Sequence, residues 1–161
     1  MTQSNEQKLS TDMALLLARI TFGGAMLWAH GWPKLANFST ISEKFPSLFG
    51  LSSSTCLGLA IFAEVFCAIL LILGLTSRFA LSQLIVTMSV GVYVNLFIFQ
   101  RQLFDSPGKP SAELAFIYLM VFVILMILGP GRVSLDAVIS EKRAQKKSSS
   151  KKKENTSSKK K

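Results

Sequence analysis

Two charged side chains, Arg19 and Glu64, lie well inside long apolar stretches of the chain. If these stretches cross a membrane, a charge at that depth is costly and normally faces the protein interior with a partner. Counted at 1.5 Å per helical residue from Asp12 and from Leu75, at the same end of the bundle, Arg19 lies about 10 Å and Glu64 about 16 Å inside. We therefore expect the two to pair. The pair would either fix how two helices pack or form a polar site for a quinone head group, a lipid or a proton.

His30 is the only histidine in the chain. Eleven helical residues after Arg19 it returns to nearly the same face, so it should point into the bundle near its outer end. It could act as a proton relay or substrate contact, or as a hydrogen-bonded residue at a helix end. One histidine cannot supply two axial haem ligands. No cluster of His, Cys and carboxylate at metal-binding spacing accompanies it, so we predict no metal site.

A second polar group is expected at the outer end of the bundle, level with His30. Tyr93 and Asn95 lie near the end of one apolar stretch, and Glu113 begins the next. Together with Lys34 they form a candidate outer polar pocket. For Asn95 the alternative is helix–helix contact in lipid, and for Glu113 it is a favourable charge at a helix N-terminus.

Four stretches are long and apolar enough to position these residues as membrane-spanning helices, which need about 20 apolar residues each. They are residues 13–32, 56–75, 79–99 and 112–128. Backbone groups in lipid must be hydrogen-bonded within the segment, which favours helices. The predicted fold is all-α: an integral membrane four-helix bundle over residues 13–136.

The first connection, residues 33–55, has apolar residues at helical spacing, interrupted by Pro46. This pattern favours a short interfacial helix in the first external loop. A loop with some buried aromatic side chains is the alternative.

The C-terminal segment 137–161 is basic, and from residue 141 onward Ala144 is its one apolar residue. Residues 141–161 hold ten of the eighteen Lys and Arg but only two of the nine Asp and Glu. Such a segment cannot bury enough apolar surface to fold, so we predict a disordered tail. It would either attract anionic lipid head groups or serve as a solvated topology anchor. Charge confined to a tail also argues against a folded nucleic-acid-binding domain.

With four spans both termini lie on one side of the membrane, and the cations of the tail place that side in the cytoplasm. Residues 1–12 then form a cytoplasmic N-terminal segment.

These landmarks together resemble the DoxX family of small four-helix bacterial membrane proteins. The resemblance rests on Arg19, the run His30-Gly31-Trp32-Pro33-Lys34-Leu35, Glu64, the turn Gly74-Leu75-Thr76-Ser77-Arg78, Glu113 and the run Gly129-Pro130-Gly131-Arg132-Val133-Ser134-Leu135-Asp136. Relatives often carry a histidine near the outer end of the third span, where this chain has Val94-Asn95.

The resemblance implies a compact bundle in the bacterial cytoplasmic (inner) membrane. Some relatives are associated with quinone-linked oxidation of thiosulfate, or with membrane redox complexes alongside soluble partner enzymes. The chain itself has no C-x-x-C, no G-x-G-x-x-G and no Walker motif, so a cofactor or quinone would come from elsewhere.

Two functions follow as hypotheses. The first is a membrane subunit, catalytic or non-catalytic, of a quinone-linked redox or detoxification system with a soluble or membrane redox partner. The second is a non-catalytic scaffold or a binder of lipids or other hydrophobic ligands. Assembly as a homo-oligomer stays open under both.

Overall fold

The structure, a computed structural model, describes the backbone of residues 2–104 and 109–158, and the side chains of residues 6–104 and 109–146. Its elements are α1 (Thr2–Ala25), η1 (Met26–Gly31), α2 (Trp32–Ala36), α3 (Phe38–Ser42), α4 (Ser53–Ile61), η2 (Phe62–Cys67), α5 (Ala68–Leu73), α6 (Ser77–Tyr93), η3 (Val94–Ile98), α7 (Glu113–Leu128) and α8 (Leu135–Ser158). No β-strand occurs among the described residues. The prediction of an all-α bundle is confirmed.

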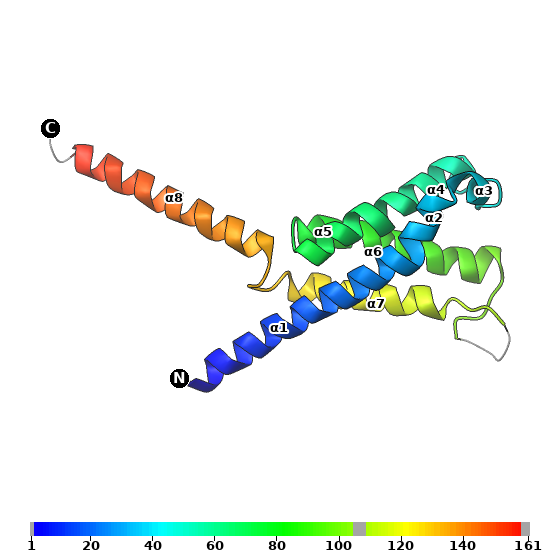
Figure 1. Cartoon of the computed structure of the whole chain (residues 1–161), viewed down its shortest axis with the longest axis horizontal. Helices are drawn as coiled ribbons and strands as arrows, with labels where there is room; N and C mark the ends of the chain where they lie inside the picture. Colours follow the sequence, from blue (N-terminus) through cyan, green and yellow to red (C-terminus); the bar gives the residue numbers. More distant parts are fainter. Residues whose placement is uncertain (1, 105–108, 159–161) are drawn as a thin grey trace.

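Four apolar helical rods form the bundle, and its two ends differ (Figure 1). The start of α1, the α5–α6 turn and α8 lie at one end, here called the termini end. The connecting segments 37–52, 99–104 and 109–112 lie at the other, here called the loop end.

Three of the rods are long and apolar enough to cross a membrane: Glu6–Ala36, Ser53–Leu73 and Ser77–Ile98. The fourth, α7, is apolar but has 16 residues, or about 24 Å of helix. It packs along α6, with Ala115 beside Gly91.

Each of the three long rods contains one π-helical turn. The turns η1, η2 and η3 carry His30, Glu64 and Asn95, respectively. A π turn inserts one extra residue into a helix and is found most often at functional sites. Three of the polar residues expected in the bundle thus lie where their helices depart from regular α geometry.

Glycines set the register between the first two rods. A Cβ at Gly31 would lie 2.6 Å from the carbonyl oxygen of Glu64, and a Cβ at Gly23 would lie 2.8 Å from Ile72. Real Cβ atoms essentially never approach another atom below 3.0 Å, and at Gly31 the atom is part of a backbone, so the two backbones can meet there only through glycine. Gly31 is therefore level with Glu64.

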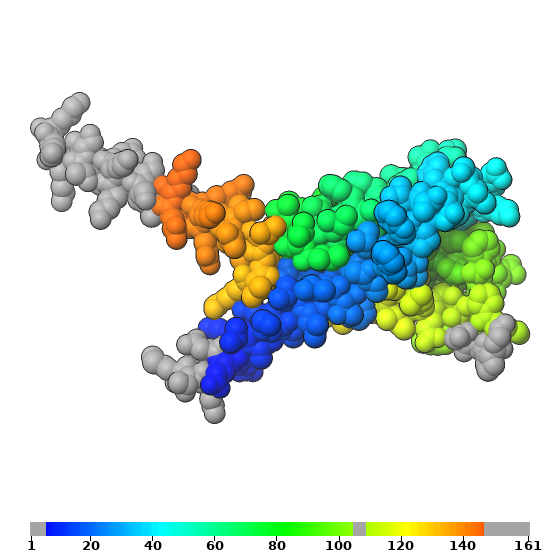
Figure 2. All heavy atoms as spheres, viewed as in Figure 1, coloured from blue at the N-terminus to red at the C-terminus, as the bar shows by residue number. Residues whose placement is uncertain are grey.

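The segment after α7 ties the termini end together. The Arg132 N–H donates to the Asp12 carboxylate at 2.9 Å, and the Asp136 N–H donates to the Gly74 carbonyl at 2.9 Å. The Asp136 carboxylate accepts the N–H groups of Thr76 and Ser77 at 2.7 and 2.8 Å. It therefore caps the N-terminus of α6 from another element. Figure 2 shows this segment between α1 and the end of α5.

The predictions for the first connection and for the C-terminal tail have different outcomes. The first connection does contain a short helix, α3. The tail differs from the prediction of disorder, because the backbone of α8 is helical from Leu135 to Ser158. Lys, Arg, Gln and Ala are good helix formers, and a helix needs no packed core to satisfy its backbone. The described side chains of residues 141–146 are all exposed, and α8 projects away from the bundle (Figures 1 and 2).

Replacing Gly31 with alanine should destabilise the bundle, because the added methyl group meets the backbone of Glu64. Overpacking of this kind costs about 1–3 kcal/mol. Gly58 is a matched control, since a Cβ there has no atom within 4 Å. Gly58→Ala should be neutral or stabilise by up to about 1 kcal/mol through helix propensity. Thermal unfolding in lipid nanodiscs measures both, and equal melting temperatures for the two variants would contradict this account of the register.

The cap on α6 predicts a pH dependence. Burial raises the pKa of Asp136, but the hydrogen bonds from Ser77 and Thr76 and the charge of Arg19 outweigh it, and the pKa lies below the usual aspartate value. A lowered pKa contributes stability that is present above the unfolded-state pKa, about 3.9, and is lost as the pH falls through the folded-state pKa.

Asp136→Ala should therefore cost about 0.5–2 kcal/mol at pH 7, the usual value for a lost cap. The gap to wild type should narrow as the pH falls below about 4, because protonation removes the same interaction from the wild type. Glu141→Ala, at an exposed position on α8, controls for loss of a carboxylate as such. A gap that stays constant down to pH 3 would show that the charge of Asp136 does not matter.

Candidate functional site

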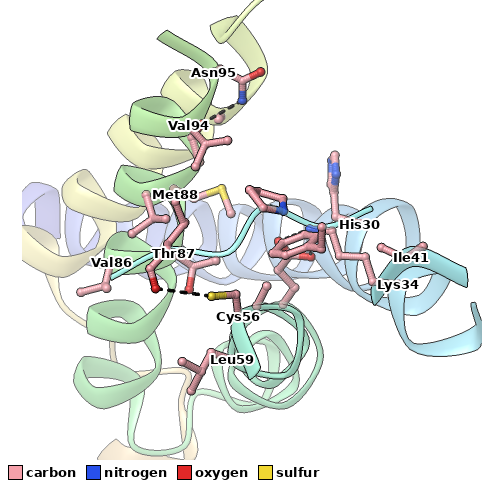
Figure 3. A pocket seen from close by; sticks show the side chains of 18 of the residues that line it. His30, Lys34, Ile41, Cys56, Leu59, Val86, Thr87, Met88, Val94 and Asn95 are labelled. Carbon is pink, nitrogen blue, oxygen red and sulfur yellow. Dashed lines mark hydrogen bonds and ion pairs between the residues drawn. The ribbon is translucent and has the colours of Figure 1, made fainter. Parts of the chain in front are cut away.

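A cavity of about 800 Å³ opens in the loop-end half of the bundle. The helices that surround it contribute His30 and Lys34 from the first rod, Cys56 and Leu59 from α4, and Val86, Met88 and Val94 from α6 and η3 (Figure 3). Tyr118 of α7 and the segment from Thr40 to Leu51 complete the wall. The walls are mainly apolar, with a few polar groups, as in sites for small organic ligands.

The most polar feature of the cavity is an ion pair between Lys34 and Glu64. The Lys34 Nζ lies 2.5 and 2.6 Å from the two carboxylate oxygens of Glu64. The Glu64 side chain is 3% exposed and the Lys34 side chain 26% exposed. The pair therefore reaches from the interior of the bundle to its surface at the loop end.

The predicted pairing of Arg19 with Glu64 is wrong. It rested on aligning Asp12 with Leu75 at the termini end, whereas the structure places Gly74 against the side chain of Arg19. Arg19 is therefore level with the end of the second rod, near Gly74. Glu64 is level with Gly31, which lies twelve residues or about 18 Å beyond Arg19. Lys34 is three residues from that level, and its flexible side chain reaches back to Glu64.

Arg19 does not line the cavity. It belongs to the contacts that hold the termini end together, here called the clamp, which are made by Asp12, Arg19, Gly74, Thr76, Ser77, Arg132, Val133 and Asp136. It is 1% exposed, and its Nη2 donates a hydrogen bond to the Val133 carbonyl. A Cβ at Gly74 would collide with its Nη1, so Gly74 leaves the room that the guanidinium occupies. Asp136 provides the opposite charge. The role that this geometry supports for Arg19 is to join the segment after α7 to the α5–α6 turn.

His30 lies in the wall of the cavity, as the helical spacing predicted for a residue facing the bundle. Its ring packs edge-on against Tyr118, with centroids 5.5 Å apart. Tyr118 itself is 7% exposed and also contacts Phe22 and Phe122. The imidazole is therefore held by an aromatic cluster within electrostatic range of Glu64 and Lys34.

The four residues of the candidate outer pocket do not all line the cavity. Lys34 and Asn95 line the cavity, whereas Tyr93 and Glu113 do not. Asn95 donates to the Gly91 carbonyl at 2.8 Å and accepts from Arg101 at 2.8 Å, so its amide supports the rim. Tyr93 is 46% exposed and packs against Phe97. Glu113 begins α7, where its charge is favourable at a helix N-terminus.

Two residues with a clear place in the structure were not assigned as sites from the sequence. Tyr118 is one of two tyrosines and lies in the middle of the fourth apolar stretch, where a buried hydroxyl is a signal for a polar contact. Asp136 stood in the run that resembles the DoxX family, but nothing in its spacing pointed to the N-terminus of α6. Among the described residues, no group of three or more His, Cys, Asp or Glu side chains is placed to hold a metal ion.

Comparison with known proteins identifies the family. A family model described as DoxX matches residues 14–100, which is more than half of the chain. The match spans all three π-helical turns and both partners of the Lys34–Glu64 pair. No curated protein and no solved structure gives a match. By this match the chain is a membrane protein of the DoxX family.

Proposed function

We propose that this chain is the membrane subunit of a quinone-linked redox or detoxification system and that it binds the quinone head group in the loop-end cavity. The observation that carries the proposal is the Lys34–Glu64 pair, with one partner buried, in the wall of an otherwise apolar cavity. Buried ion pairs add little net stability, and an ionisable residue inside a membrane is a functional candidate by default. A flat apolar ring with two polar oxygens suits such a site.

The chemistry requires two electrons and two protons for each quinone reduced to the quinol. Lys34 can donate a hydrogen bond to a carbonyl oxygen, and Glu64 at the same place can accept a proton as the carboxylate and give it up as the carboxylic acid. His30, in the wall of the same cavity and within electrostatic range of both, is the further group that can hold a proton. The proposal assigns the electrons to a redox partner, soluble or in the membrane.

Under this proposal the protein lies in the bacterial cytoplasmic membrane with both termini in the cytoplasm. The cations of the tail support that orientation. The cavity then opens in the half of the bilayer away from the cytoplasm. A binder of lipids or other hydrophobic ligands without redox chemistry is the competing function, and absence of quinone binding in the experiment below would favour it.

Quinone binding to purified protein in lipid nanodiscs is the direct test. We expect saturable binding to the wild type and binding at least about tenfold weaker in Glu64→Gln, the factor set by loss of a hydrogen bond to a charged group. Glu113→Gln is the matched control, because Glu113 does not line the cavity, and it should bind as the wild type does.

Each outcome has a distinct meaning when the melting temperatures show that the variants are folded. No binding to the wild type would sink the quinone proposal and leave the scaffold or lipid binder. Equal binding by wild type and Glu64→Gln would place the quinone away from the Lys34–Glu64 pair. Glu64→Gln is preferred to a Lys34 variant, since removing Lys34 strands a buried carboxylate and itself costs stability.

We further propose that α8 and the residues after it bind anionic lipid head groups. Leu135, Val138 and Ile139 are each more than a third exposed, at helical spacing that continues into Lys142 and Lys146. This arrangement presents apolar contact followed by positive charge, and each cation near an anionic surface contributes about 1 kcal/mol.

Trypsin, which cleaves after Lys and Arg, should therefore cut the tail more slowly in nanodiscs with anionic lipid than in nanodiscs with zwitterionic lipid. The difference should vanish in 1 M salt, where the screening length is about 3 Å. Electrophoresis of the shortened chain follows the reaction. Equal rates on the two lipids at low salt would leave the tail as a solvated topology anchor.

A further inference from the structure

The cavity has a side opening toward the surrounding lipid, between α4 and α6. α4, which continues directly into η2, packs against α2 and α3, whereas α6 packs against α5, η2 and α7. In the described part of the chain α4 and α6 barely touch each other. A π turn is a known cause of helix bends. The bend at η2 therefore explains why η2 and α5 of the second rod pack against α6, whereas α4 of the same rod does not.

Two apolar residues border this opening. Leu59 of α4 and Val86 of α6 both line the cavity and are 55% and 59% exposed. Leu59 is six residues, or about 9 Å, from the start of its rod, and Val86 is twelve residues, or about 18 Å, from the loop end of its own. In a hydrocarbon layer about 30 Å thick, an opening at that depth faces lipid chains and not water.

At the loop end itself the cavity-lining residues Phe49, Phe99 and Leu114 are also exposed. Below that end, the other sides of the cavity are covered. Gly31 brings the first rod against η2, α7 packs along α6, and the segment from Thr40 to Leu51 lies over the loop end. The polar groups, Lys34 and Glu64, lie on the wall formed by the first and second rods. A ligand with its head at this pair can extend a chain into the bilayer only where the wall is open and apolar.

We infer that the ligand is a tailed amphiphile: its polar head group lies at Lys34–Glu64 and its hydrocarbon chain leaves the bundle between Leu59 and Val86. This inference rests on the proposed function and makes it more specific, since it distinguishes a quinone with a long chain from a free, water-soluble ring. It also makes the gap between α4 and α6 the route by which the ligand exchanges with the membrane.

Two quinones test the inference: a benzoquinone with a decyl chain and the same ring with a methyl group in its place. Binding of each to full-length protein in nanodiscs is compared for wild type, Leu59→Trp and Val86→Trp. Ile124→Trp is the matched control, because Ile124 of α7 is 54% exposed and does not line the cavity.

Both tryptophan variants at the opening should weaken binding of the decyl quinone at least about fourfold, the factor for one methylene group excluded from an apolar site. Binding of the ring alone should be unchanged, and Ile124→Trp should bind both quinones as the wild type does. Because all three positions are exposed, folding should survive, and the melting temperature checks it.

Decyl-quinone binding that is the same in wild type, Leu59→Trp and Val86→Trp would overturn the inference while the proposed function stands. Equal weakening of both quinones by the two variants would also overturn it, since the opening would then act on the head group. No binding of either quinone to the wild type would instead overturn the proposed function, and the inference with it.

Discussion

The contact between Gly31 and the backbone of Glu64 is the constraint on which the rest of the structure depends. Two helices that meet backbone to backbone cannot slide past each other, because any neighbouring register would put a side chain where only hydrogen fits. Once this register is fixed, Glu64 is level with the last residue of η1 and within reach of Lys34. The same register brings Arg19 to Gly74, at the other end of the bundle. A shift of one turn would leave both charges without these partners, at the cost of an unpaired buried charge.

The register thus divides the buried charges between two ends with different properties. At the termini end, Arg19 and Asp136 join three separate segments through short contacts, with Gly74 at their centre. At the loop end, Lys34 and Glu64 face a cavity and are joined only to each other in the described structure. One end has the geometry of a clamp and the other has the geometry of a site. A single substitution at each end should therefore separate stability from binding.

The sequence predicts the number and place of the apolar rods well, because hydropathy over about 20 residues is a strong signal. It also identifies Arg19, Glu64 and His30 as residues that face the bundle, since a charge within an apolar span avoids lipid by turning inward. It does not predict which charges meet, because depth counted along a helix assumes that the ends are aligned, and α1 extends beyond the bundle. Nor does regular 3.6-residue periodicity reveal the π turns, each of which shifts the following side chains by one residue. The helical tail shows a different limit: composition excludes a packed core but not an isolated helix.

A cavity of this size is also consistent with what holds a bundle together in lipid. Lipid chains solvate apolar side chains as well as the protein interior does, so the hydrophobic effect does not close a gap between helices as it would in water. α4 can therefore diverge from α6 at little cost if lipid or a ligand fills the space, provided that other contacts hold the rods. The polar clamp at the termini end and the Gly31 contact are such contacts, and both lie away from the opening. The open half of the bundle follows from holding the helices firmly elsewhere, and the three π turns adjust the side chains of that half without disturbing the clamp.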